Sequence, residues 1–166
     1  MDLKARYKII KRTAALVVAT VAFYGTALGI VQYYENRSSH HIAGEWDLNL
    51  KIESTSYNPY KNLEVGYKIY LSQHEKRVVG RGEKWWVDGE EIPFSQHDPI
   101  RVEGVMIGNE LPLSFILKGS KRETVGTFDL RLESEDKFIG TFSTTGANSR
   151  GSVVMTKTLS SSSKTY

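Results

Sequence analysis

The chain has 166 residues, no cysteine and a formal net charge of +3. Without cysteine it forms neither disulfides nor thiolate metal sites. Five basic residues lie within the first twelve positions, opposed only by Asp2. The remainder is therefore nearly neutral, and its charge excludes an extended surface for a DNA or RNA polymer.

The longest apolar stretch covers residues 13–34 and contains no Asp, Glu, Lys, Arg, Pro or His. A helix of roughly 20 apolar residues spans a hydrocarbon layer about 30 Å thick, so this stretch predicts one transmembrane helix. Residues 1–12 then form a basic juxtamembrane leader in contact with membrane lipid. The alternative is a cleaved signal peptide, but its apolar region is usually about 7 to 15 residues long and ends at a small-x-small site. This run ends in Gln32-Tyr33-Tyr34, which favours a retained anchor.

Gly25 and Gly29 form a G-x-x-x-G pair within this stretch. Small residues at this spacing allow two helix backbones to approach closely, so the anchor is a candidate surface for homo-oligomer formation. Glycine is also simply common in membrane helices, and the sequence supports both interpretations equally.

The charges flanking the apolar stretch predict its orientation. Clusters of basic residues remain on the cytoplasmic side, and on the other flank we count only Arg37 in the hinge, residues 35–43. For a bacterial inner membrane this bias places the following domain in the periplasm. Residues 158–166 are Ser-rich, which is typical of a disordered tail.

From Gly44 onward, apolar and polar residues alternate with a period of two, as in Trp46, Leu48, Leu50 and Ile52. This alternation is typical of strands with one buried and one solvated face. Further strands are predicted at residues 63–71, 76–87, 99–107, 110–118, 122–133, 137–143 and 150–157. Short polar turns between several of them favour an antiparallel up-and-down meander.

An open eight-stranded sheet would expose two edges, whereas closure removes them. The sequence therefore predicts an all-β protein: an eight-stranded antiparallel barrel at residues 44–157, preceded by the single transmembrane helix. Glycines within the strands support closure, because tightly coiled strands need them. In a closed meander the first strand pairs with the last, which places Trp46 beside residues 155–157. We expect Lys157 or Arg150 to cap the indole at this end, the barrel floor.

The Gly44-Glu45-Trp46 opening and a basic residue on the last strand resemble the G-x-W pattern of lipocalin-like barrels. With the N-terminal anchor, the whole chain resembles the membrane-anchored β-barrel effectors of bacterial CBASS anti-phage systems. The resemblance implies a barrel that binds a cyclic oligonucleotide made by a partner nucleotidyltransferase, followed by oligomerisation, inner-membrane disruption and cell death. The family pattern has two spans and a cytosolic barrel, whereas this chain has room for one span.

A cyclic oligonucleotide presents phosphates, which need cations, and bases, which need aromatic faces. Both residue types gather on residues 76–87 and the neighbouring strands, so the candidate ligand-binding residues are Tyr67, Arg81, Lys84, Trp86 and Arg101. We expect Tyr67 to face inward and Tyr70 outward, and the adjacent Trp85 and Trp86 to point to opposite faces. Ordinary packing with solvated charges on the outer face is the alternative.

The sequence contains none of the common catalytic motifs, such as G-x-S-x-G, a Walker loop or H-E-x-x-H. Its four histidines fall in the hinge or in predicted loops. We therefore expect no enzyme activity, metal or cofactor. Two other functions remain open beside the effector: a periplasmic, signal-anchored, lipocalin-like carrier of a small apolar ligand, and a structural subunit of a membrane complex.

Overall fold

A computed structural model describes residues 40–119 and 122–158 of the chain. Two units are distinguished, Met1–Ser38 and Ser39–Tyr166, and the described residues belong to the second. The predicted leader, the apolar stretch with Gly25 and Gly29, most of the hinge and most of the tail lie outside the described residues. Within the described part of the chain, no helix has both the length and the apolar character that a membrane crossing requires.

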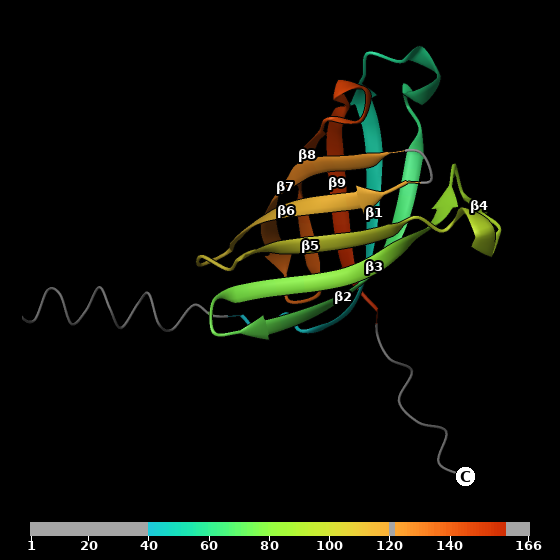
Figure 1. The fold of residues 1–166 in the computed structure, drawn as a ribbon. Helices are drawn as coiled ribbons and strands as arrows, with labels where there is room; N and C mark the ends of the chain where they lie inside the picture. Colours follow the sequence, from blue (N-terminus) through green and yellow to red (C-terminus); the bar gives the residue numbers. More distant parts are fainter. Residues whose placement is uncertain (1–39, 120–121, 159–166) are drawn as a thin grey trace, which may run out of the picture. The chain divides into compact units, whose positions relative to one another are not determined.

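Eight long strands form the fold, as the alternating pattern predicts (Figure 1). They are β1 (Gly44–Ser54), β2 (Glu64–His74), β3 (Arg77–Val87), β5 (Pro99–Val105), β6 (Glu110–Lys118), β7 (Glu123–Ser134), β8 (Lys137–Thr144) and β9 (Arg150–Lys157). A two-residue strand, β4 (Glu90–Glu91), and three short 3-10 helices, η1 (Asn58–Tyr60), η2 (Phe94–Gln96) and η3 (Gly146–Asn148), lie in the connections. The polar–apolar alternation does not predict these four elements.

The long strands close into an antiparallel barrel, which confirms the barrel part of the predicted fold. They follow one another in the order β2-β1-β9-β8-β7-β6-β5-β3, and pairing of β2 with β3 completes the ring. The first and last long strands pair as expected, with Trp46 opposite Lys157. Closure leaves no long strand with an unpaired edge.

Bulky side chains fill the floor of the barrel, the end that contains Trp46. Trp46 has no exposed surface, and its ring meets the edge of Phe138 at a centroid distance of 5.5 Å. The indole Nε1 donates a hydrogen bond to the backbone oxygen of Ile42 at 2.8 Å. Ile42 is itself buried, and its backbone N donates to Oε1 of Gln73 at 2.8 Å. The core therefore includes a residue of the predicted hinge. One apolar residue in a polar run gives no periodic signal, so the sequence does not predict its burial.

A β-bulge in β3 changes the expected orientation of its two tryptophans. Gly66 lies opposite Trp86 and Tyr67 lies opposite Lys84, so Trp85 is the extra residue of the bulge. The Trp86 ring occupies the space that a Cβ on Gly66 would need, on the outer side of β2. Trp85 also lies outside, beneath the Nζ of Lys68 at 4.4 Å from its ring centroid. The expectation that Trp85 and Trp86 point to opposite faces is therefore wrong.

Candidate ligand-binding cavity

A cavity of about 570 Å³ opens at the end of the barrel opposite the floor, which we call the mouth. This volume falls within the range of about 300 to 1,000 Å³ that is usual for small-molecule sites. Eight of the residues that line the cavity have apolar side chains: Leu50, Ile52, Leu63, Val65, Val87, Phe115, Leu117 and Phe142.

The two ends of the barrel differ in the side chains that some of the strands place there. Thr124, Thr144 and Ser149 line the mouth, whereas Trp46 and Phe138 fill the floor. Short side chains leave space that long aromatic ones would occupy. One barrel thus has a packed half and a hollow half.

An ion pair between Lys84 and Asp98 lies in the wall of the cavity. Lys84 Nζ is 2.6 Å from Asp98 Oδ2, and the backbone N of Lys84 donates to the backbone oxygen of Asp98 at 3.0 Å. About a quarter of each side chain is exposed, at 22% and 26% respectively. Charge-assisted hydrogen bonds of this kind are short and hold their partners in place.

Tyr67 lies directly across the strand pair from Lys84 and also lines the cavity. Burial is the main cause that raises the pKa of Tyr67 above its ordinary value of 10.0, and the negative charge of Asp98 raises this pKa further. The phenol therefore keeps its proton at neutral pH and can donate a hydrogen bond. As expected, Tyr70 points the other way and is exposed.

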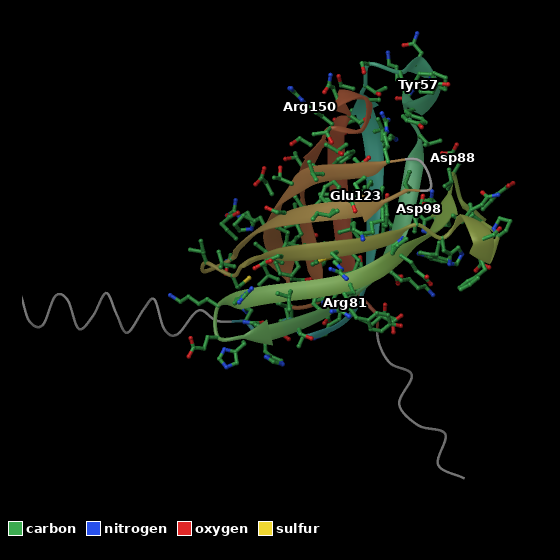
Figure 2. The ribbon with its side chains drawn as sticks, viewed as in Figure 1. Tyr57, Arg81, Asp88, Asp98, Glu123 and Arg150 are labelled. Carbon is green, nitrogen blue, oxygen red and sulfur yellow. The ribbon has the colours of Figure 1, made fainter. Side chains whose placement is uncertain are left out.

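Asp98 reaches the cavity through an arm formed by residues 88–98, which contains β4 and η2. The arm folds back onto β3, where Trp86 pairs with Glu91 and the backbone N of Ile92 donates to the Trp85 oxygen at 3.0 Å. At its far end, His97 Nε2 lies 3.1 Å from the oxygen of Ile92. Figure 2 shows Asp98 at the side of the barrel from which this arm projects, and Arg81 on β3 farther from it.

The five candidate ligand-binding residues separate into two groups. Tyr67 and Lys84 meet in the cavity. Arg81 and Arg101 lie opposite each other on the outer face, where both are exposed. Trp86 covers Gly66 on the outside. The structure thus brings two of the five together and separates them from the other three.

Two charged residues of the cavity wall, Asp98 and Arg122, are absent from the sequence-based set. Asp98 lies in a predicted loop, and only the return of the arm onto β3 brings it to Lys84. Arg122 opens a predicted strand at the mouth and lines the cavity. Arg122 could have been predicted from the order of the strands in the meander, because this order places Arg122 at the same end of the barrel as Lys84.

At the floor, Lys157 Nζ lies 5.7 Å from the centroid of the Trp46 ring, within the range of a cation–π contact. Arg150, the other residue considered there, begins β9 at the opposite end and is exposed. Among the described residues, no group of three or more His, Asp or Glu side chains is placed to hold a metal ion.

Comparison with solved structures agrees with a closed, small β-barrel. A redesigned β-barrel has a TM-score of 0.58 at 10% identity and matches 74% of this chain and 96% of its own. The redesigned barrels mFAP1 and mFAP0, each bound to DFHBI, have TM-scores of 0.55 and 0.53 at 6% and 5% identity. These two matches cover 74% and 70% of this chain and 99% and 98% of the other chain.

At these identities the likeness shows the eight-stranded antiparallel fold alone. No family model and no curated protein matches the sequence. The fold and the cavity therefore define the class as a small, eight-stranded antiparallel β-barrel with a hollow mouth.

Proposed function

We propose that the barrel is the receptor part of a membrane-anchored anti-phage effector, and that its mouth binds a cyclic oligonucleotide. The observation that supports this proposal is the presence of three charged side chains, Lys84, Asp98 and Arg122, in a wall that is otherwise mostly apolar. Partial burial of an ion pair costs desolvation energy that its mutual attraction does not fully recover. A cavity for a purely apolar ligand would need none of these charges.

The cavity offers a chemical partner for each part of such a ligand. Lys84 and Arg122 supply cations for phosphate oxygens. The apolar walls can pack against the faces of bases, Asp98 can accept hydrogen bonds from their amino groups, and the Tyr67 phenol can donate one. Together they match a ligand that is flat and apolar in one part and anionic in another.

The rest of the proposal concerns the sequence outside the described residues. Residues 13–34 anchor the chain in a bacterial inner membrane, and Gly25 and Gly29 form the face through which anchors associate. Ligand binding drives assembly, and the assembled helices disrupt the membrane. For the ligand to reach the cavity, the barrel must lie in the compartment in which the nucleotidyltransferase makes it.

Thermal unfolding of the full-length chain in detergent, with and without a panel of cyclic di- and trinucleotides, tests ligand binding. At a ligand concentration 100-fold above Kd, binding adds about 2.7 kcal/mol to stability. For a domain of this size that corresponds to a rise in Tm of about 10 °C. The double variant Lys84→Met/Asp98→Asn and the variant Arg122→Gln should each lose most of this rise.

Arg81→Gln and Arg101→Gln are the matched controls, because they remove the same kind of charge from the outer face. The Tm of each variant with ligand is compared with the Tm of the same variant without ligand, so a change in basal stability does not affect the measured rise. An equal rise in all four variants would place the nucleotide outside the cavity. If no nucleotide raises the Tm of the wild-type chain, the proposed receptor function is wrong.

A carrier of a small apolar ligand is the second candidate, and the eight apolar side chains of the wall favour it. The same assay separates the two, because a carrier should be stabilised by long-chain alcohols or fatty acids and not by nucleotides. A reporter fused after Tyr166 that is active only in the periplasm would also favour the carrier. Absence of stabilisation by either class would favour a structural subunit.

A further inference from the structure

A second surface of the barrel lies on its outer face, away from the cavity. It comprises Tyr70 on β2, Val79 and Arg81 on β3, Arg101 on β5 and Ile116 on β6, and we call it the arginine face. These strands are neighbours in the barrel and follow one another across one side of it (Figure 1). Tyr70, Val79 and Ile116 are large apolar side chains left exposed, at 59%, 40% and 42%.

Arg81 and Arg101 stand at the centre of the arginine face, directly opposite each other across the β3–β5 pair. Like charges in such a position repel and destabilise a sheet. Neither arginine forms an ion pair within the part of the chain that the structure describes, and the nearby carboxylates face other partners. Glu103 binds Arg77 at 2.7 Å, and Glu83 lies 3.3 Å from His97.

We propose that the arginine face docks on the surface of an anionic lipid bilayer. Arginine beside exposed tyrosine and aliphatic side chains suits the headgroup layer, where cations meet lipid phosphates and apolar groups enter the acyl boundary. A second copy of the chain fits less well, because a symmetric contact would bring four arginines together. An acidic protein partner would satisfy the charges, but nothing holds one near the barrel.

The segment between the proposed anchor and the barrel is short, and its length limits how far the arginine face can move from the bilayer. This inference rests on the proposed anchor at residues 13–34. Ile42 is buried in the floor, and His40 Nε2 lies 3.2 Å from Oδ1 of Asn109. Five residues, 35–39, therefore join the proposed anchor to the described barrel, and five residues span at most about 18 Å. A short connection gives the bilayer a high effective concentration at the barrel surface, so weak contacts suffice.

The full-length chain in lipid nanodiscs provides the test, and its lack of cysteine allows a single label. Ile116→Cys carries an environment-sensitive NBD dye on the arginine face. Ile139→Cys is the matched control, because Ile139 has a similar exposure, 38%, but lies on β8, away from this face. We expect a blue shift of NBD emission at position 116, and quenching by brominated lipid, only when phosphatidylglycerol is mixed with phosphatidylcholine.

Arg81→Gln and Arg101→Gln should each weaken the contact equilibrium about fivefold, since one basic residue near an anionic surface contributes about 1 kcal/mol. High salt should act in the same direction. Identical emission at positions 116 and 139, or emission at 116 that is indifferent to lipid charge, would overturn the docking surface and leave nucleotide binding untouched. Failure of the chain to co-elute with nanodiscs would instead refute the anchor, and with it this inference.

Discussion

Tyr67 is the residue in the cavity whose chemistry depends most on its surroundings. It is only 5% exposed, and burial followed by the Asp98 charge raises the pKa of its phenol. The folded state thus retains a proton that the unfolded state releases once the pH exceeds about 10. Its contribution to stability is therefore complete below pH 10 and is lost as the pH rises toward the folded-state pKa.

Tyr67→Phe should remove this pH dependence. Above pH 10 the wild-type free energy of unfolding should fall, on account of this one group, by about 1.4 kcal/mol per pH unit. In Tyr67→Phe the free energy of unfolding should not show this fall. Urea unfolding between pH 8 and pH 11.5 measures this fall, with Tyr70→Phe, at an exposed tyrosine of the same strand, as the control. A slope that is unchanged in Tyr67→Phe would show that this phenol is not shielded from water.

At the scale of the element, the bulge in β3 allows one strand to serve two surfaces. Lys84 faces the cavity, while Trp85 and Trp86 both pack on the outside, with ring centroids 6.4 Å apart and nearly perpendicular. Because the bulge adds one residue, Val87 again lies opposite Val65 and lines the mouth. The extra residue also increases the local bend of the strand next to the arm that carries Asp98.

Deletion of Trp85 should therefore leave a barrel that still folds cooperatively. The deletion makes the β2–β3 ladder regular without moving any other residue to the opposite face, and it should cost about 1 to 3 kcal/mol for the lost indole contacts. Deletion of Arg81, in the regular part of β3, should instead reverse the faces of one half of the strand and prevent folding. Far-UV circular dichroism and thermal unfolding distinguish the two. Equal loss of structure in both deletions would contradict the assigned bulge.

The eight long strands were predictable because each repeats a polar–apolar alternation that only a half-buried strand satisfies. The pairing of Trp46 with Lys157 followed from closure of the meander. The bulge was not predictable, since Trp85 and Trp86 supply two large residues without a pattern to show which one is extra. The place of Asp98 was not predictable for a related reason. Its contact with Lys84 depends on how an irregular arm of eleven residues folds back, and the sequence of such a segment has no periodic alternation from which its path could be predicted.

At the scale of the whole molecule, the barrel has two unlike ends and one distinctive side. The floor is packed around Trp46, the mouth is hollow and bears charges, and the arginine face occupies the outside of β2, β3, β5 and β6. In the proposed effector, these parts have separate tasks: the mouth receives the signal, and the membrane segment at residues 13–34 produces the effect. Variants that act on one task should spare the other.

Gly25→Leu and Gly29→Leu should each abolish killing of the host cell while leaving ligand-induced stabilisation of the barrel intact. A leucine at either position keeps two helix backbones apart, whereas Ala27→Leu, on the opposite side of the predicted helix, should have little effect. Survival of cells that produce the proposed effector together with a cyclic-oligonucleotide synthase measures the first property, and Tm measures the second. Undiminished killing by both glycine variants would exclude helix association as the toxic step.

The two ends of the described barrel leave it side by side. The backbone N of Thr158, directly after β9, donates to the oxygen of Glu45 at 2.9 Å, and Ile42 is held against Trp46 at the same floor. Neighbouring termini are the condition under which a chain tolerates circular permutation. A few glycines could therefore join position 158 to position 40, with new ends opened in the β6–β7 turn, and the strand order around the ring would be unchanged.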